Sequence, residues 1–503
     1  MPSMERIRSE GEELLQALAR EEYEAYSGLK PVPAFQQVFA RHAAVFSDDA
    51  LVAAREAWQG AAQGSDEWRA ARALLEWVVA TRVSRALAGL DERQLEWEAR
   101  AEARTADGRV VPFQRLPIEI ANTVDRDERR RLEQARAALV DVELAPLKRE
   151  RLERERELVL AADIANDYPA TFQKLSAIDV HALGQACTAF LNATAAMHEE
   201  LFPDAIRRQL GVSSNEATRA DASALLRMPQ FDGAFPAGAM ESTIRVQMGA
   251  MGLDSRAGGR VRYDLAEREG KRARAFCAPV RVPEEVYLVL RPHGGVGDWR
   301  TFLHELGHAL HFANVSPELA FEFRWLGDSS VTEGYAMLFD HLPRDAGWLR
   351  RYTDLRAAQL PEFLRAGALE ELLYLRRYCG KLLYELELHG GNVPMRSIPD
   401  LYVEILSSAT GVRYDRSDAF VDVDERFYVA RYLRAWQLQA VLTESLRERF
   451  DSDWWRNPAA GPWIAGNLYA EGQRELADEL AMRVAGATLD FAPLVRDLEA
   501  MLS

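Results

Sequence analysis

The sequence has few cysteines, no long apolar run and no excess of positive charge, and each absence excludes a class of protein. Its three cysteines, Cys187, Cys277 and Cys379, are far apart and form no CxxC pair, so they indicate neither a disulfide framework nor a thiolate metal site. No stretch approaches the roughly 20 uninterrupted apolar residues of a membrane span. The first residues lack the apolar segment of a signal peptide. We therefore expect a cytoplasmic protein with no membrane partner.

The charge balance is acidic. The 62 Lys and Arg residues stand against 78 Asp and Glu residues, which gives a formal net charge of −16. Such a surface repels phosphate backbones, so we expect no nucleic-acid partner. With 48% hydrophobic and 28% charged residues, the composition is typical of a globular protein with a large core. Nothing in the composition indicates an oligomeric state.

The spacing of apolar residues changes along the chain. Residues 1–230 carry apolar positions at three- and four-residue spacing, which predicts a helical N-terminal lobe. Glycine and proline become frequent after that, and alternating segments such as EVYLVLRP at 285–292 predict a small sheet within about 240–292. Helical spacing then returns and continues to the end. We expect residues 231–503 to form a second lobe that contains this sheet.

One motif carries recognisable chemistry. Residues 304–308 read His304-Glu305-Leu306-Gly307-His308, the H-E-x-x-H pattern. Positions i and i+4 share a helix face, so both imidazoles can reach one zinc ion, and Glu305 is then placed beside a water molecule rather than on the metal. His311 lies on the same face. The pattern is typical of a metal-activated hydrolase.

A hydrolytic zinc site usually has a third protein ligand. The position six residues after the second histidine is Asn314, which excludes the H-E-x-x-H-x-x-G-x-x-H arrangement. Glu333, 25 residues after that histidine in an apolar amphipathic segment, is the predicted third ligand. Two alternatives stay open: Glu333 also fits an S/T-x-x-E capping box that begins at Ser330, and Glu318 and Glu322 are nearer carboxylates.

Three blocks together resemble the oligoendopeptidase F and thimet oligopeptidase family of zinc peptidases, the gluzincins. Residues 270–272 (GKR) lead into 275–277 (AFC), similar to a family segment on a cleft strand. Residues 301–311 (TFLHELGHALH) contain the histidine motif, and Glu333 follows at the family's ligand spacing. The match in order and spacing covers about residues 260–340.

The resemblance implies a predominantly α, two-lobed helical zincin fold around a deep substrate cleft, with a small antiparallel sheet beside the zinc helix. The zinc-binding helices would span 298–345, in a catalytic lobe formed by 231–503. One Zn²⁺ per chain would be held by His304, His308 and Glu333. The expected substrates are short unstructured peptides, whose backbone pairs with an exposed strand.

The family also places tyrosines that donate to the oxyanion on a late helix. Tyr428 and Tyr432, four residues apart, correspond to that position. The sequence departs from the family here, because Arg426 stands where a histidine is found and Ala435 where a further tyrosine aligns. Both tyrosines are also compatible with ordinary half-buried helix aromatics.

Further residues near the motif are candidates for supporting roles. A ligating histidine normally donates its other N–H to a carboxylate or carbonyl, and Asp340 or His341 could serve. His293 lies in a glycine-rich loop before the zinc helix, where it contacts substrate or has no role.

The resemblance predicts a zinc-dependent metalloendopeptidase, an oligopeptidase in which Glu305 takes a proton from water and delivers it to the leaving amine. A first alternative is a carboxypeptidase or dipeptidyl carboxypeptidase of the same clan, as in the angiotensin-converting and thermostable carboxypeptidase branches. A second, of another class, is a peptide-binding scaffold with weak or lost catalysis.

Overall fold

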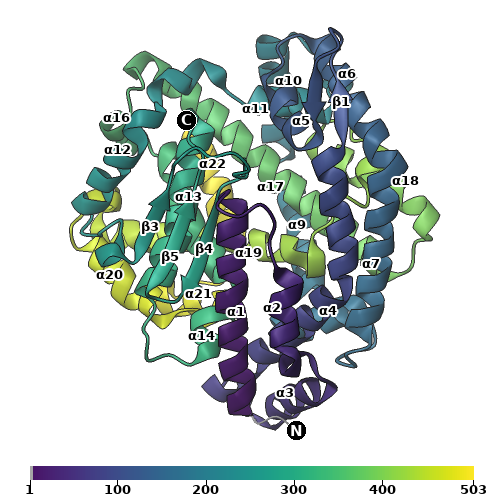
Figure 1. The fold of residues 1–503 in the computed structure, drawn as a ribbon. Coiled ribbons are helices and arrows are strands. Elements are labelled where there is room, and N and C mark those ends of the chain that lie inside the picture. The colour runs from purple at the N-terminus through teal and green to yellow at the C-terminus, as the bar shows by residue number, and fades with distance from the viewer. Residues whose placement is uncertain (1–3, 503) are drawn as a thin grey trace. The chain divides into compact units, whose positions relative to one another are not determined.

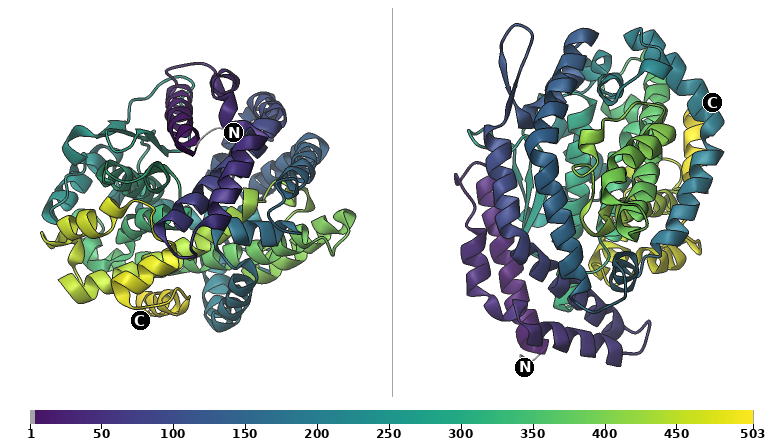
Figure 2. Two further views of the ribbon diagram at one scale, coloured as in Figure 1. Left: turned by 90° about the horizontal axis from the view of Figure 1, so that it is seen from below. Right: turned by 90° about the vertical axis from the view of Figure 1, so that its right-hand side faces the viewer.

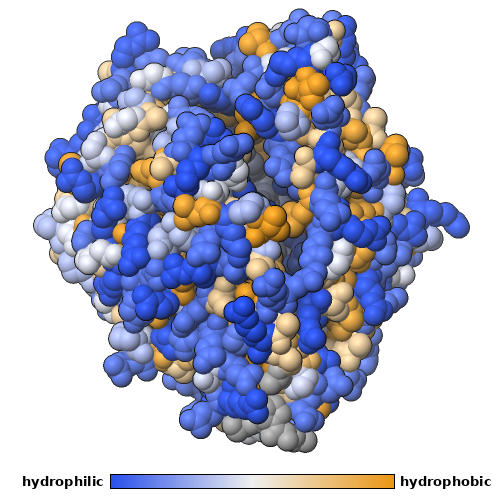
Figure 3. Space-filling view, in the orientation of Figure 1, coloured by the Kyte–Doolittle hydropathy of each residue, from blue (hydrophilic) through white to orange (hydrophobic). Residues whose placement is uncertain are grey.

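Helices dominate the protein. The computed structural model describes residues 4–502, except for the side chain of Ala44. The chain is 72% helical, and coiled ribbons fill each view in Figures 1 and 2. This confirms the prediction of a predominantly α fold. Hydrophilic residues cover most of the face drawn in Figure 3, with apolar residues scattered among them. Within the described residues, no helix is long and apolar enough to cross a membrane.

The chain forms two compact units, and neither is a continuous stretch of sequence. The first unit contains residues 1–82, 229–364 and 434–496, and the second contains 83–228, 365–433 and 497–503. These units differ from the contiguous lobes 1–230 and 231–503 expected from the sequence. The expected boundary lies close to the point between Met228 and Pro229 where the chain passes from the second unit to the first. The N-terminal 82 residues, however, belong to the same unit as the three-stranded sheet.

The helices and strands of the first unit are α1 (Met4–Tyr26), α2 (Phe35–Arg41), α3 (Asp48–Gly60), α12 (Ala237–Ala250), β3 (Val261–Asp264), β4 (Phe276–Arg281), β5 (Glu285–Val289), α13 (Val296–Asn314), α14 (Phe321–Trp325), α15 (Ser329–Asp340), α16 (Ala346–Tyr352), α20 (Ala460–Asn467) and α21 (Ala477–Ala485). Four helices have residues in both units: α4 (Asp66–Arg100), α17 (Leu360–Gly390), α19 (Tyr428–Phe450) and α22 (Ala492–Leu502).

The second unit contains a two-stranded antiparallel sheet and further helices. Its elements are β1 (Glu102–Arg104), β2 (Val110–Pro112), α5 (Leu116–Asn122), α6 (Arg126–Leu139), α7 (Ala145–Leu160), α8 (Tyr168–Ser176), α9 (Val180–Ala193), α10 (Ala195–Leu210), α11 (Arg219–Leu226) and α18 (Ile398–Thr410). The carboxylate of Asp422, whose side chain is 9% exposed, is the centre of a polar cluster in this unit. It pairs with Arg377 and Lys381 and accepts the hydroxyl of Tyr402 at 2.8 Å.

The sheet of the first unit has three strands in the order β3-β5-β4, which Figure 1 shows side by side. Strands β4 and β5 form an antiparallel hairpin, whereas β3 runs parallel to β5. The sheet is therefore mixed: the β4–β5 pair is antiparallel, as the sequence predicted, and the β3–β5 pair is parallel, which differs from that prediction. The reason is that the hairpin inserts β5, its second strand, beside β3. The sheet is also shorter than expected, because residues 237–250 form helix α12.

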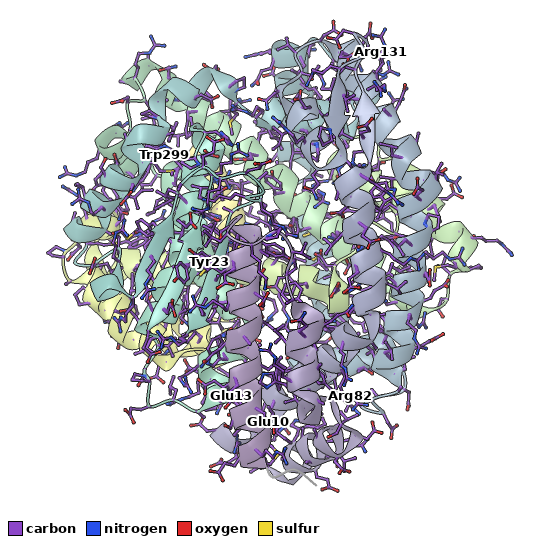
Figure 4. The ribbon with its side chains drawn as sticks, viewed as in Figure 1. Glu10, Glu13, Tyr23, Arg82, Arg131 and Trp299 are labelled. Atoms are coloured by element: carbon purple, nitrogen blue, oxygen red, sulfur yellow. The ribbon has the colours of Figure 1, made fainter. Side chains whose placement is uncertain are left out.

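Two helices cover the two faces of this sheet. On one face, α1 packs Tyr23 against Ala278 and Val280 of β4, and its ring stacks on Tyr287 with centroids 3.7 Å apart. Figures 1 and 4 show α1 beside the sheet, and Figure 4 labels Tyr23. On the other face, the ring of Phe302 on α13 meets Tyr263 of β3 edge to face at 5.2 Å. These contacts explain why the N-terminal helix belongs with residues more than 200 positions later.

Candidate metal centre

Helix α13 is mostly buried, but one of its faces carries polar residues. Two glycines with positive φ, Gly294 and Gly295, turn the chain into its first turn, and the Asp298 carboxylate accepts the backbone N–H groups of His293 and Gly294. The apolar positions of the helix are buried, among them Phe302, Leu303, Leu306, Ala309 and Leu310. His304, Glu305 and His308 are only half-buried. The three polar residues of the motif therefore share the face that the core leaves accessible.

Helix α15 carries Glu333 one turn after its start. Asp328 is the N-cap, and its carboxylate accepts the N–H of Ser330 at 2.9 Å. Ser330 is thus inside the helix, and the capping box considered from the sequence does not form. The Glu333 carboxylate, 6% exposed, points at the two histidines instead.

The two helices meet at a glycine. A Cβ atom at Gly307 would lie 2.6 Å from Cα of Ala336 and 2.8 Å from the carbonyl oxygen of Tyr335, which are backbone atoms that cannot give way. Only glycine allows α13 and α15 to approach this closely. The close approach places Glu333, one turn before Ala336, beside the two histidines that flank Gly307 in the sequence.

The three candidate ligands converge with the spacing that a zinc ion requires. Nε2 of His304 and Nε2 of His308 each lie 3.5 Å from Oε2 of Glu333, and all three ligand atoms lie within 4.8 Å of one another. A tetrahedral zinc ion with ligand distances of about 2.0–2.2 Å spaces its ligand atoms by about 3.3–3.6 Å. Two imidazoles and one carboxylate are also a donor set typical of hydrolytic zinc. The residues therefore fit this ion.

The charges of the site favour a cation between these side chains. Burial acts to raise the pKa of the Glu333 carboxyl, but hydrogen bonds and charge from His304 and His308 outweigh burial and hold that pKa well below its usual range. Burial acts to lower the pKa of His304, but hydrogen bonds to Asp340 and Glu333 raise it well above its ordinary value. The centre thus combines the ionised Glu333 carboxylate with the carboxylate of Asp340, and positive charge is favoured between them.

Asp340 is the partner that orients His304. Its Oδ2 lies 2.8 Å from Nδ1 of His304, and its Oδ1 lies 2.6 Å from Nδ1 of His341. Of the two supporting residues considered from the sequence, Asp340 therefore contacts the ligand directly, and His341 contacts Asp340. Burial acts to raise the pKa of Asp340, but the two histidines keep it well below its usual range.

Thr332 is a partner that sequence reasoning missed. Its Oγ1 lies 2.9 Å from Nδ1 of His308 and 3.1 Å from Nδ1 of His311. His311 is 0% exposed, and burial, with the nearby charge of His308, lowers its pKa to about 3. His311 therefore lies behind the metal site, not in it. The only available signal was the place of Thr332 directly before Glu333.

Glu305 lies near strand β4. Burial is the main cause that raises the pKa of the Cys277 thiol, and the negative charges of Glu305 and Glu22 add to it. This interaction places the Glu305 carboxylate near the edge strand of the sheet, because Cys277 lies on β4 and the strand order puts β4 at one end.

The two competing carboxylates do not belong to this group. Glu322 is 0% exposed and pairs with Arg8 at 2.7 Å. Glu318 is exposed. Among residues 4–502, the group His304, His308 and Glu333 is the one whose side chains could hold a metal ion.

The GKR segment at 270–272 links two strands of the sheet through Lys271. Lys271 is buried, and its Nζ lies within 3.1 Å of the carbonyl oxygens of Asp264, Ala266 and Leu290 and of the Asp264 carboxylate. It ties the end of β3 to the end of β5. Strand β4 begins only at Phe276, after the block. His293, in the glycine-rich loop, is exposed, and its backbone N–H helps cap α13.

The two candidate oxyanion donors lie together in the second unit. Tyr428 and Tyr432 are half-buried on α19, and their rings meet edge to face with centroids 4.9 Å apart. The helix begins after two residues with positive φ, Arg426 at 49° and Phe427 at 52°. Such a backbone is costly for residues other than glycine.

Comparison with known proteins relates the chain to a solved enzyme structure. No protein-family model matches the sequence, and no curated protein sequence matches it. The chain is similar to the crystal structure of an M32 carboxypeptidase from Deinococcus radiodurans R1, with 16% sequence identity and a TM-score of 0.62. The match covers 99% of this chain and 98% of that chain, so the two proteins share a fold over nearly their whole length.

Proposed function

We propose that this protein is a zinc-dependent carboxypeptidase that acts on short peptides. The observation that carries the proposal is the convergence of His304, His308 and Glu333 on one point with the spacing of zinc ligands. The choice of a carboxypeptidase over the endopeptidase predicted from the sequence rests on the shared fold with the M32 carboxypeptidase. The oligoendopeptidase F and thimet resemblance covers about 80 residues, whereas the fold match covers 99% of the chain.

The metal would be held by the three converging side chains. When bound, zinc supplies Lewis acidity, which polarises a carbonyl group and lowers the pKa of water toward about 7. Asp340 accepts a hydrogen bond from Nδ1 of His304, and Thr332 does the same for His308. Both partners leave Nε2 of each imidazole as the atom that faces Glu333.

Glu305 is the proposed general base. It follows His304 directly on α13, so it lies beside the ligand set, and in the H-E-x-x-H pattern this position suits proton transfer and not metal binding. In the proposed reaction, a carboxylate oxygen of Glu305 takes a proton from the attacking water and transfers it to the nitrogen of the leaving amino acid. Peptide hydrolysis needs no other reactant.

Tyr428 and Tyr432 remain the proposed donors to the oxyanion, on the resemblance alone. A deep cleft that admits only unstructured peptides, and a cytoplasmic location, also remain predictions from the sequence.

Peptide digestion tests the proposal. Zinc-loaded protein is incubated with peptides that have free ends, an amidated C-terminus or both ends blocked, and the products are sized by mass spectrometry. We expect stepwise loss of single residues from free C-termini only. Release of dipeptides indicates a dipeptidyl carboxypeptidase, and internal cuts in doubly blocked peptides indicate the endopeptidase. Zinc binding without any turnover indicates a peptide-binding scaffold.

The Glu305→Gln variant serves as the matched control for the base. We expect it to bind zinc as the wild type does and to lose peptide cleavage. Retained turnover in this variant would remove Glu305 from the proposed reaction.

A further inference from the structure

We propose that Thr332 is a positioning residue of the metal centre, whose hydroxyl links His308 to the buried His311 in one hydrogen-bond chain and so fixes which nitrogen of His308 faces the metal. This inference rests on the proposed function, because it takes His308 to be a zinc ligand. It adds two residues, Thr332 and His311, to the three ligands and the base.

Two hydrogen bonds join the three side chains. One oxygen, Thr332 Oγ1, lies 2.9 Å from Nδ1 of His308 and 3.1 Å from Nδ1 of His311. Both distances are those of ordinary hydrogen bonds. The two histidines are three residues apart on α13, so their rings lie on one face of that helix, and α15 supplies the hydroxyl between them.

The donors and acceptors of these three side chains determine which atoms carry the protons. A histidine that binds metal through Nε2 carries its hydrogen on Nδ1, and His308 therefore donates to Thr332 Oγ1. A threonine hydroxyl has one hydrogen to donate, and the second imidazole nitrogen at that oxygen, Nδ1 of His311, can accept it. Hence His311 is held as the tautomer with hydrogen on Nε2. Reversing the direction of both bonds would put the hydrogen of His308 on the nitrogen that faces Glu333.

The surroundings of His311 favour this neutral, fixed form. The ring is fully buried and lies among aromatic side chains, with centroid distances of 5.0 Å to Tyr335, 5.1 Å to Phe312 and 5.8 Å to Tyr469. Such buried surroundings disfavour the charged imidazolium, whose two nitrogens could only donate hydrogen bonds. A neutral His311 retains an acceptor nitrogen for the Thr332 hydroxyl.

Thr332 also differs from several other helical threonines of the protein. A threonine inside a helix commonly donates its hydroxyl to the carbonyl four residues earlier. Thr81, Thr171 and Thr410 do so, at 2.6, 2.7 and 2.8 Å. The Thr332 hydroxyl contacts the two imidazoles of a neighbouring helix instead.

The test measures zinc affinity of metal-free protein by competition with a chromophoric chelator, together with the visible spectrum of bound Co²⁺. We expect Thr332→Val, which keeps the shape and removes the hydroxyl, to weaken zinc binding about 10- to 100-fold. Thr332→Ser restores the hydroxyl and should remain within about threefold of the wild type. Thr443→Val is the control, because Thr443 is also buried but its hydroxyl accepts Gln439 at 2.9 Å.

A second pair of variants changes His311, at the other end of the hydrogen-bond chain. This pair remains informative if Thr332→Val does not fold. His311→Asn keeps an acceptor near the position of Nδ1, and His311→Leu removes it. We expect zinc affinity close to that of the wild type for Asn and about three- to tenfold weaker for Leu. In the double variant Thr332→Val/His311→Leu, the effects should be less than additive, because both substitutions break the same chain.

Four results overturn the inference. Equal zinc affinity of Thr332→Val and wild type excludes a positioning role. Equal losses for Thr332→Ser and Thr332→Val assign the effect to packing, as do equal losses for His311→Asn and His311→Leu. A wild type that binds no zinc at all refutes the proposed function itself, and with it the role of His308 from which this inference starts.

Discussion

The carboxylate of Asp340 lies 2.8 Å from Nδ1 of His304, on the opposite side of the imidazole from the nitrogen that faces Glu333. Asp340→Asn keeps the size of the side chain but removes its charge, which weakens the hold on His304. We expect zinc affinity to fall by about 10- to 100-fold, measured by chelator competition. Asp254→Asn is the control, because the Asp254 carboxylate accepts the backbone N–H groups of Arg256 and Gly258 and contacts none of the candidate ligands. An unchanged affinity in Asp340→Asn would assign Asp340 a role in folding only.

Gly307 sets the distance between α13 and α15. Gly307→Ala places a Cβ atom 2.6 Å from Cα of Ala336, so the helices must separate. Overpacking of this kind typically costs about 1–3 kcal/mol, and we expect a lower Tm together with weaker zinc binding. Gly297→Ala in the same helix meets no atom within 4 Å and should gain up to about 1 kcal/mol. Equal Tm values for the two variants would contradict the close approach.

Tyr428 and Tyr432 can be tested without disturbing their packing. The Tyr→Phe substitution keeps the ring contact of 4.9 Å and removes only the hydroxyl. If either hydroxyl donates to the oxyanion, kcat should fall by about 10²- to 10³-fold with little change in KM, because removal of one such donor typically has this effect. Steady-state kinetics on one peptide checks this. Unchanged kcat in both variants would leave the tyrosines as ordinary helix aromatics.

Glu285 should make stability depend on pH. Burial acts to raise its pKa, but hydrogen bonds from Tyr287 and Arg20, and the charge of Arg262, lower it from 4.5 to about 2. A pKa that is lower in the folded state contributes stability that is complete above the unfolded value and is lost as pH falls through the folded value. The contribution of Glu285 is therefore full above pH 4.5 and disappears toward about pH 2.

Urea unfolding of metal-free protein at pH 6 and pH 3 measures this effect. Other carboxyls of the chain also titrate in this range, so the comparison is between wild type and Glu285→Gln. We expect the variant to lose less stability between the two pH values than the wild type does. Parallel losses in both proteins would show that Glu285 is not held as an ion.

Asp422 holds the polar cluster of the second unit. Its side chain is 9% exposed and lies beside Arg377 and Lys381, with the Tyr402 hydroxyl as donor. Asp422→Asn removes the counter-charge of Arg377, whereas Lys381 keeps its ion pair with Asp424 at 2.8 Å. Loss of one partner of a buried pair typically costs about 3–5 kcal/mol. Chemical denaturation checks this. The exposed Asp400 is the control, since Asp400→Asn should change stability by less than about 1 kcal/mol.

The local part of the metal centre could be predicted from the sequence, and the part made by contacts between helices could not. His304 and His308 are four residues apart, so a helix places them together whatever surrounds it. Glu333 followed from the need for a third ligand. Thr332 carries no such signature, because a threonine before a glutamate becomes a histidine partner only once α15 packs on α13.

The sheet, too, could be predicted from the sequence only in part. The alternating residues within about 240–292 predicted a sheet, and β3 and β5 do lie within that range. Their parallel pairing could not be predicted, because it depends on where the β4–β5 hairpin inserts. Nor does the sequence near Tyr23 indicate a partner such as Tyr287, since the stacking joins residues 264 positions apart that only the folded chain brings together.

Helix α15 supplies more of the centre than its single ligand suggests. Within 12 residues it contains Glu333, the hydroxyl that bonds His308 and the carboxylate that bonds His304. Each contribution of this helix is directed at α13, so a displacement of α15 by one residue would misplace the ligand and both partners at once. The ligand set therefore depends on the packing of one pair of helices, and any change that separates α15 from α13 loosens the third ligand and both supporting hydrogen bonds together.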